Sequence, residues 1–463
     1  MKRIAVAFVA GLALAACDGG PAEAPSERGS SAAAPQAPET AAAAGAPDRR
    51  GAEPREAADL DAIGEAFVKL ALGVGEHDPA FVDAYHGPAE WAAAAKAQKP
   101  SLDDLEAEAR ALLISVARAR ETEPGVRGAM QEKLIRAALA RIEMTQGRSF
   151  SFDEETRLLY DAVAPAYDTA DFDAALEEID ALIPGEGPLA ERVDVFRNSL
   201  AIPRDRLRAV FDAAIAECRK RTLARYDLPD TERFTLEFVT DKPWSGYNWY
   251  QGDYESVIQV NTDFPIVIDR AVDLGCHEGY PGHHTWNIKL ERDLLEGRDW
   301  IEYSVYPLFS PLSVIAEGSA NYGIDLAFPG PEKIAFERDV LFPLAGLDPA
   351  KAATLDKLNT ARRRLSHARN YVARDYLDGR ITREEAIDLM TRYGLQSRER
   401  AEQGVRFIET YRGYVINYNL GRDLVGAYVD ARVRGGDDPW AVFRFLLSTP
   451  LAASDLASSQ PPE

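Results

Sequence analysis

Apolar residues recur at a helical period along most of this chain. Leu60, Ile63 and Phe67 are spaced as residues on one face of a helix are. Three later stretches are rich in residues that favour helix, chiefly Ala, Leu, Arg and Glu: 105–120, 130–145 and 207–222. The pattern therefore predicts a mainly α protein, a large multi-helix domain whose helices continue to about residue 448.

Strand-like alternation is confined to the middle of the chain. Residues 234–239 and 256–261 alternate apolar and polar side chains, which is typical of half-buried strands. We interpret the aromatic, glycine-containing segment 244–250 between them as a loop or hairpin. The simplest arrangement is a small antiparallel sheet directly before a histidine-rich helix. The strand at 256–261 could then accept an extended peptide as a further strand, and a purely structural strand is the alternative. The side chains expected to contact such a substrate are Asn248, Tyr250 and Asn261.

The first residues have the pattern of an export signal. Lys2 and Arg3 precede a short apolar run that ends in small residues at Ala16, as in secretory signal peptides. Cys17 follows directly, and the sequence Leu-Ala-Ala-Cys resembles the lipobox of bacterial lipoproteins. The resemblance implies cleavage before Cys17 and lipidation of its thiol, although an ordinary signal peptide with an incidental cysteine is the alternative. We expect a periplasm-facing lipoprotein of the bacterial cell envelope, on either the inner or the outer membrane.

Composition divides the chain into four parts. Residues 1–16 are predicted to be the lipoprotein signal peptide, and 17–55 a disordered Ala/Pro-rich tether with almost no large apolar side chains. Residues 56–450 are predicted to form the helical domain, and 451–463 a flexible tail. The net charge is −22 and no basic patch is present, so nucleic acid is not an expected partner. The pattern does not indicate an oligomeric state.

Two cysteines remain after Cys17. Cys218 and Cys276 could form a disulfide in an oxidising compartment, but the sequence does not give the distance between them. Cys276 precedes a histidine and could be considered a metal ligand. We favour the interpretation that it is a small buried apolar residue.

Three of the six histidines lie in the segment His-Glu-Gly-Tyr-Pro-Gly-His-His, at positions 277, 283 and 284. On an unbroken helix His277 and His283 would lie about 120° apart around the axis, too far to share a metal ion. Pro281 disfavours a continuous helix, and a break there can bring His283 back beside His277. We therefore predict His277 and His283 as metal ligands, with His284 as the rival second ligand.

A third ligand is expected from an apolar stretch further along the chain. Residues 311–328 carry only two charges, one of which is Glu317. A buried carboxylate is costly unless it is paired or bound to a cation, so Glu317 is the candidate, and a pair with an arginine is the alternative. Catalytic zinc usually has three protein ligands and keeps one open position. The prediction is one zinc ion, with Glu278 beside His277 as general base.

At these residues the chain resembles a known family. The motif formed by His277, Glu278, Pro281, Gly282, His283 and His284, followed by Glu317-Gly318-x-Ala320-x-Tyr322, is similar to the domain-of-unknown-function 885 family. That family is grouped with gluzincin-type zinc peptidases and is common among bacterial lipoproteins. The resemblance implies a mostly helical, zincin-like fold and metal ligation by His277, His283 and Glu317. It also implies that the segment of Tyr418 lies near the site. Ser319 and Trp286 depart from the family pattern, which puts the choice of substrate in doubt more than the metal site.

These observations favour a zinc-dependent hydrolase, specifically a peptidase that cleaves peptide bonds with metal-activated water. Tyr418 is the expected oxyanion donor, and Tyr322, one turn after Glu317, is the alternative and a candidate substrate contact. Two other functions stay open: a metal-dependent hydrolase of a non-peptide amide or ester, and a binding lipoprotein without catalysis. The expected partners are a peptide substrate and, through Cys17, a membrane. The pattern does not indicate whether cleavage would be internal or at either end of a peptide.

Overall fold

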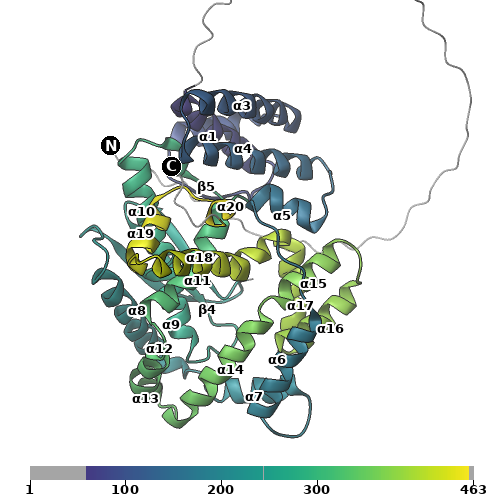
Figure 1. Cartoon of the computed structure of the whole chain (residues 1–463), viewed down its shortest axis with the longest axis vertical. Helices are drawn as coiled ribbons and strands as arrows, with labels where there is room; N and C mark the ends of the chain where they lie inside the picture. Colours follow the sequence, from purple (N-terminus) through teal and green to yellow (C-terminus); the bar gives the residue numbers. More distant parts are fainter. Residues whose placement is uncertain (1–58, 243, 458–463) are drawn as a thin grey trace, which may run out of the picture.

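The computed structural model describes residues 59–242 and 244–457, which form a mainly helical protein with two small sheets (Figure 1). The prediction of a mainly α fold is confirmed. The predicted signal peptide, the tether and Cys17 lie outside the described residues. Among the helices of the described ranges, none has the length and apolarity that crossing a bilayer requires.

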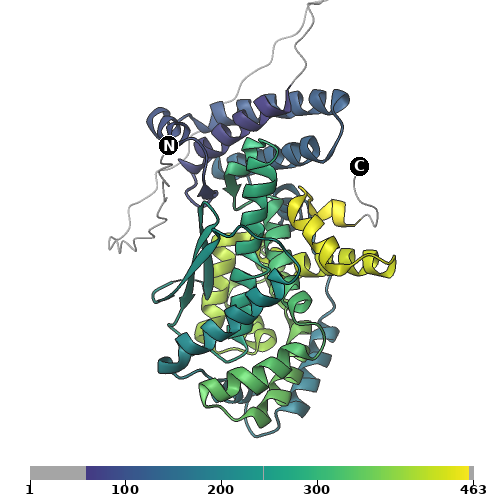
Figure 2. The ribbon, with the colours of Figure 1, turned by 90° about the vertical axis from the view of Figure 1, so that its left-hand side faces the viewer.

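Three long helices form a layer at one end of the molecule, at the top of Figures 1 and 2: α1 (Leu60–Gly75), α3 (Leu102–Thr122) and α4 (Val126–Thr145). The hydroxyl of Ser101 accepts a hydrogen bond from the backbone N–H of Asp104, which satisfies a free donor at the start of α3. The buried residues of α3 recur at helical spacing: Leu105, Ala109, Leu112, Val116 and Ala119. The helices predicted from residues 60–72, 105–120 and 130–145 are confirmed.

The remaining helices form two groups. One group occupies the centre and left of Figure 1: α8 (Leu207–Leu223), α9 (Arg270–Leu274), α10 (His283–Lys289), α11 (Leu312–Ala327), α12 (Glu332–Phe336), α13 (Phe342–Ala345), α18 (Ile416–Arg434), α19 (Pro439–Ser448) and α20 (Ala453–Leu456). The other lies on the right: α5 (Phe152–Tyr160), α6 (Thr169–Leu182), α7 (Leu189–Asn198), α14 (Ala352–Leu365), α15 (Ala368–Leu377), α16 (Arg383–Gly394) and α17 (Arg398–Tyr411). The short α2 (Ala89–Gln98) packs against α1.

The larger sheet contains β2 (Arg233–Val239), β3 (Gly246–Gly252) and β4 (Glu255–Asn261), in the order β2-β4-β3. β4 is antiparallel to β3 but parallel to β2, so the predicted antiparallel sheet is wrong for one of its two strand pairs. The reason is that β3 and β4 form a hairpin, while the segment after β2 crosses so that β2 lies beyond β4. Of the two interpretations of 244–250, the hairpin holds from residue 246 onward: the segment is strand β3, paired antiparallel with β4, and its Tyr and Trp residues suit a strand.

This strand order changes which strand a peptide could join. β4 is the central strand and is paired on both sides, so residues 256–261 cannot accept a further strand as predicted. In the part of the chain that the structure describes, β3 pairs only with β4 and has a free edge. A second, two-stranded antiparallel sheet is formed by β1 (Val82–Tyr85) and β5 (Val305–Pro307). Strands this short leave little alternation in the sequence, which is why the pattern did not predict them.

The predicted flexible tail is wrong for its first residues. Leu451 and Leu456 are buried in the core, and Leu456 is the last residue of the short helix α20. Asp455 of α20 forms an ion pair of 3.0 Å with Lys133 of α4. The helical domain therefore extends to about residue 457, because these apolar side chains cover α18 and the N-terminal layer.

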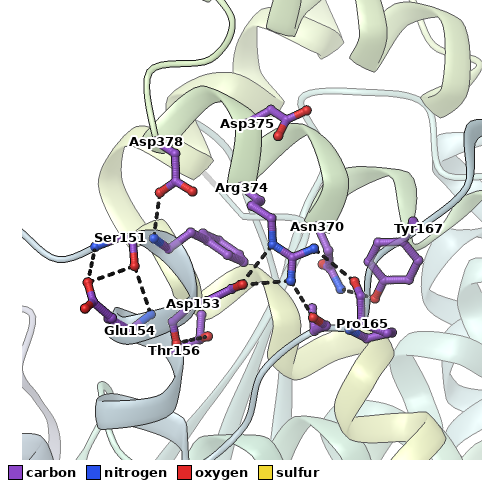
Figure 3. A network of polar contacts seen from close by, with 12 residues as sticks. Ser151, Asp153, Glu154, Thr156, Pro165, Tyr167, Asn370, Arg374, Asp375 and Asp378 are labelled. Atoms are coloured by element: carbon purple, nitrogen blue, oxygen red, sulfur yellow. Dashed lines mark hydrogen bonds and ion pairs between the residues drawn. The ribbon is translucent and has the colours of Figure 1, made fainter.

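Helix α15 is fastened to α5 by a polar network (Figure 3). The Arg374 guanidinium donates to Asp153 Oδ1 at 2.9 Å and to the carbonyl of Pro165 at 2.9 Å. Asp378, at the end of α15, accepts a hydrogen bond of 2.7 Å from the backbone N–H of Phe152. These charge-assisted bonds fix α15 against the body of the protein. The first turn of α15 borders the large cavity of the protein and is thereby held in a defined position.

Candidate metal centre

The helix that carries His277 is broken where Pro281 predicts a break. After α9 the chain makes a π-helical turn, Gly275–Gly279, and Tyr280 then has an extended backbone. The peptide bond before Pro281 is cis, and α10 begins at His283. The two histidines therefore lie on separate helical segments, and the 120° offset of a continuous helix does not apply.

Gly282 closes this break tightly. Its N–H donates to the carbonyl of Cys276 at 3.0 Å. A Cβ at position 282 would lie 1.9 Å from the carbonyl oxygen of His277, so no residue with a side chain fits. The chain thus folds back onto itself, and the rings of His277 and His283 come to 4.7 Å between centroids. The sequence -Pro-Gly-His- therefore allows two histidines six residues apart to come together.

His277, His283 and Glu317 come together at this point. Nε2 of His277 lies 3.3 Å from Oε2 of Glu317, and Nε2 of His283 lies 3.7 Å from the same oxygen. One ligand atom from each of the three residues lies within 4.8 Å of the other two. The structure thus brings together the three predicted ligands, from the π-helical turn, α10 and α11.

The three side chains fit a bound cation. Ligands of a tetrahedral zinc ion at about 2.0–2.1 Å are separated from one another by about 3.4 Å, close to the distances between these atoms. Oε2 of Glu317 is buried and faces the two imidazole nitrogens, and among the described residues it has no partner with full hydrogen-bond geometry. Its other oxygen, Oε1, accepts a hydrogen bond of 2.8 Å from the hydroxyl of Tyr414, which turns Oε2 toward the two imidazoles. Among the described residues no arginine pairs with Glu317, so the alternative of a Glu–Arg pair is not what the structure contains.

Electrostatics at the triad favour the ionised carboxylate. Burial alone would raise the pKa of Glu317, but hydrogen bonding and charge from His277 and His283 hold that pKa well below its usual value. Burial alone would lower the pKa of His283, and the Glu317 carboxylate raises it instead. A carboxylate and two imidazoles in this arrangement form a donor set that carries one negative charge, which suits a divalent ion.

His284 has a different role from His283. It is fully buried, its Nδ1 lies 2.7 Å from Ser256 Oγ, and its Nε2 lies 3.0 Å from Glu232 Oε2. Both ring nitrogens are therefore engaged on the side of the loop away from Glu317. Glu232 also accepts a hydrogen bond from the hydroxyl of Tyr280 and pairs with Arg219 at 2.6 Å. This buried network holds the 280–284 loop from behind.

A disulfide fixes the same segment on another side. Cys218 of α8 is bonded to Cys276, with Cα atoms 5.5 Å apart. The sequence left this disulfide open, and Cys276 is buried as expected and is not one of the three candidate metal ligands. Because Cys276 precedes His277, the covalent link ties the metal-ligand turn to α8.

Glu278, the predicted base, is buried and borders the same cavity as the triad. Strand β3 passes close by: a Cβ on Gly246 would lie 3.0 Å from Oε1 of Glu278. The side-chain amide of Asn248 donates to the carbonyl of Glu278 at 2.6 Å. Oδ1 of Asn248 is buried and has no hydrogen-bond partner, so it can accept an N–H from a substrate.

The cavity has a volume of about 940 Å³ and reaches from the triad to α14 and α17. Near the triad its wall is rich in tyrosine: Tyr247, Tyr306, Tyr411, Tyr414 and Tyr418. Tyr418 lies on α18, whose backbone carbonyl at this residue accepts a hydrogen bond of 3.1 Å from Asn321. Burial and the charge of Glu317 raise the pKa of Tyr418 well above its usual value. Its phenol is therefore protonated at neutral pH and can donate.

Three of the four predicted substrate contacts, Tyr250, Asn261 and Tyr322, have partners within the fold. The hydroxyl of Tyr250 donates to Glu291, and the ring is buried. The amide of Asn261 donates to the carbonyls of Lys242 and Trp244, which closes the loop before β3. Tyr250 and Asn261 border the cavity, but Tyr322 does not; its ring lies 6.1 Å from that of Phe443, toward α19. Among the four predicted substrate contacts, only Asn248 both borders the cavity and has an unpaired polar atom.

Sequence reasoning missed Asp83, Tyr247 and Tyr414. Asp83 of β1 accepts a hydrogen bond of 2.7 Å from the hydroxyl of Tyr247, and both side chains border the cavity. Burial raises the pKa of Asp83, and the charge of His283 opposes this effect. No local pattern marks these residues, since each reaches the site through tertiary packing. For Tyr414 the spacing to Tyr418, four residues along a helix, was an available signal.

No family model matches this chain. No curated protein matches its sequence. Among solved structures, it is similar to a candidate lipoprotein from Colwellia psychrerythraea, with 16% identity and a TM-score of 0.49 over 77% of this chain and 63% of that protein. A candidate lipoprotein of unknown function from Shewanella oneidensis gives 14% identity and a TM-score of 0.47, over 79% of this chain and 75% of that one.

An M32 carboxypeptidase from Deinococcus radiodurans R1 gives 14% identity and a TM-score of 0.37, over 84% of this chain and 87% of that enzyme. The match covers less than two thirds of the length of the Colwellia protein. Likeness at these TM-scores says nothing about the activity of this chain. Membership of the domain-of-unknown-function 885 family stays a prediction.

Proposed function

We propose that this protein is a zinc-dependent hydrolase that cleaves peptide bonds. One observation carries the proposal: His277, His283 and Glu317 place their ligand atoms within 4.8 Å of one another beside a cavity that Glu278 also borders. Two imidazoles and one carboxylate are the donor set of many catalytic zinc sites, which leave a position open. The buried oxygen of Glu317 that faces both imidazoles supports a cation at this point.

A zinc ion held by these three residues would supply Lewis acidity toward a water molecule and a substrate carbonyl. Glu278 would take the proton of the attacking water and pass it to the leaving nitrogen. Its backbone is held by Asn248, which supports this role because the hydrogen bond of 2.6 Å fixes the carbonyl next to the base. The protonated phenol of Tyr418 is the proposed donor to the developing oxyanion.

The proposed peptide would lie along β3. This strand has a free edge within the described chain and passes Glu278 closely at Gly246. An extended peptide can add to such an edge through backbone hydrogen bonds. The unpaired Oδ1 of Asn248 provides one further acceptor for a substrate N–H.

We further propose that the chain is exported and anchored through a lipid on Cys17. The basic start and apolar run before Cys17 support export, and so does the disulfide between Cys218 and Cys276, because structural disulfides persist in oxidising compartments. Metabolic labelling with a tagged fatty acid tests the anchor. The wild-type protein should carry the label, and the Cys17→Ser variant should not.

The activity is tested with purified, zinc-loaded protein and a mixed peptide library, with cleavage sites assigned by mass spectrometry. We expect cleavage by the wild type and a loss of turnover of at least about 100-fold in Glu278→Gln, which keeps its zinc. Glu291→Gln is a matched control, because Glu291 is a buried acid bonded to Tyr250 rather than to the triad. Zinc binding without cleavage of any peptide by the wild type would contradict the proposed activity.

A further inference from the structure

The large cavity is much less acidic than the rest of the protein. The chain contains 75 acidic and 53 basic residues, yet eight basic and seven acidic side chains border the cavity. Two of those acids, Glu278 and Glu317, belong to the proposed catalytic site. A divalent ion would add positive charge, so the occupied cavity would favour an anionic ligand.

Most of the basic side chains in the cavity wall already have acidic partners. Arg197 pairs with Asp269 at 3.2 Å and Lys333 pairs with Asp273 at 3.1 Å. The other pairs are Arg270 with Asp273, Arg363 with Asp325, Arg400 with Asp194, and Arg422 with Asp325. Within the described residues, Arg362 and Arg369 are the two cavity arginines for which no acidic partner is present. These two guanidiniums are therefore available to a ligand.

Arg369 is the one of the two that lies near the proposed site. It stands in the first turn of α15, which the Arg374 network fastens to α5 (Figure 3). Arg369 lies close enough to Tyr418 for its charge to lower the pKa of that phenol, while Glu317 and Glu278 act on the same phenol in the opposite direction. The residue after Arg369, Asn370, donates to Oδ1 of Asn419 at 2.8 Å, which places the start of α15 beside Tyr418. The charges that act on Arg362 are instead those of Arg197, Arg270 and Arg400 and of Asp269, which is already paired with Arg197.

We propose that Arg369 binds a carboxylate of the peptide substrate. It thereby selects peptides that have their C-terminal carboxylate, or an acidic side chain, near the scissile bond. This inference rests on the proposed peptidase function and names its substrate class. Arginine suits the role because its planar guanidinium can form two parallel hydrogen bonds with one carboxylate.

The Arg369 side chain borders the cavity and is exposed to the solvent within it. Arginine stays protonated in proteins, so the side chain is a permanent cation facing the substrate space. The rigid position of α15 reduces the entropy that would be lost when a carboxylate binds.

The test measures binding as well as cleavage. Zinc-loaded Glu278→Gln protein is incubated with two matched libraries of N-acetylated tetrapeptides, one ending in a free carboxylate and the other in a carboxamide. Bound peptides are identified by affinity selection and mass spectrometry. We expect the free acids to be enriched about 10- to 100-fold over the amides, as for a charge-assisted contact in a cavity. The Glu278→Gln, Arg369→Met double variant should lose this preference. The Glu278→Gln, Arg369→Lys double variant should keep part of it.

Arg364→Met is the matched control, because Arg364 pairs with Glu178 on the outer surface and does not border the cavity. Enrichment confined to amides with Asp or Glu side chains, and lost with Arg369→Met, would assign the bound carboxylate to a side chain. Equal binding of both libraries, no binding of either, or a loss caused by Arg362→Met and not by Arg369→Met would overturn the proposal. A wild type that binds free acids through Arg369 but cleaves none would contradict the peptidase function alone.

Discussion

Gly318 and Gly421 are in backbone contact where α11 crosses α18. A Cβ on Gly318 would lie 2.5 Å from the carbonyl carbon and oxygen of Gly421, and one on Gly421 would lie 2.7 Å from the carbonyl oxygen of Val314. Glu317 precedes the first glycine, and Tyr418 lies three residues before the second. The close approach of the two helices therefore determines the position of Glu317, the third ligand, relative to Tyr418 in the cavity wall.

We predict that Gly421→Ala separates the helices and lowers the free energy of unfolding by about 1–3 kcal/mol, because an added methyl group meets backbone atoms that cannot move aside. Urea denaturation followed by circular dichroism measures the change. Gly426→Ala on the same helix is the control, since its Cβ would meet only the Tyr322 ring at 3.4 Å. Equal stability of the two variants would show that the contact is not tight.

Gly282→Ala should abolish metal binding even where the protein still folds. The added Cβ would lie only 1.9 Å from the carbonyl oxygen of His277, which forces the loop open and moves His283 away from His277. Gly279→Ala, three residues earlier, should retain metal, because its Cβ would have no neighbour nearer than 3.9 Å. Zinc content per chain after dialysis distinguishes them. Full zinc occupancy in Gly282→Ala would contradict the proposed geometry.

The Glu232 network should make stability depend on pH. Burial alone would raise the pKa of Glu232, but hydrogen bonds from His284, Tyr280 and Arg219 lower it to about 2. The unfolded chain has a value of about 4.3, so the stabilisation is complete above that pH and is lost as the pH falls toward about 2. Glu232→Gln should therefore lower the free energy of unfolding by about 1–3 kcal/mol at neutral pH. This difference in unfolding free energy between wild type and variant, the gap, should narrow below about pH 4.3.

Urea titrations at a series of pH values measure this gap. Glu255→Gln is the control, because Glu255 forms an exposed pair of 3.0 Å with Arg233 that should contribute less than about 1 kcal/mol. A gap for Glu232→Gln that stays constant down to about pH 2.5 would mean that the carboxylate is not the stabilised form.

Removing the disulfide should weaken the fold around His277. The Cys218→Ala, Cys276→Ala double variant is expected to lose about 2–4 kcal/mol of unfolding free energy, since the crosslink restricts the unfolded chain. A thiol reductant should destabilise the wild type by a similar amount and leave the double variant unchanged. If the reductant affects both equally, the bond between Cys218 and Cys276 is not what it acts on.

Sequence patterns predicted those parts of the molecule that local rules govern. The long helices followed from apolar periodicity, and the break at Pro281 followed from the backbone chemistry of proline. The ligand triad could be predicted because an isolated buried acid, Glu317, required a partner. The order of strands β2, β4 and β3 could not, because alternation is the same whichever neighbour a strand chooses. Asp83, Tyr247 and Arg369 reach the cavity only through long-range packing, which leaves no mark at their own positions.

The central claim is that His277, His283 and Glu317 hold one divalent ion, and metal content per chain tests it most directly. Zinc is measured by inductively coupled plasma mass spectrometry in dialysed wild type, Glu317→Gln and Glu278→Gln. We predict about one ion per chain in the wild type and in Glu278→Gln, and less than about one tenth of that in Glu317→Gln, because catalytic zinc depends on three protein ligands. Full occupancy in Glu317→Gln, or no zinc in the wild type, would contradict the account.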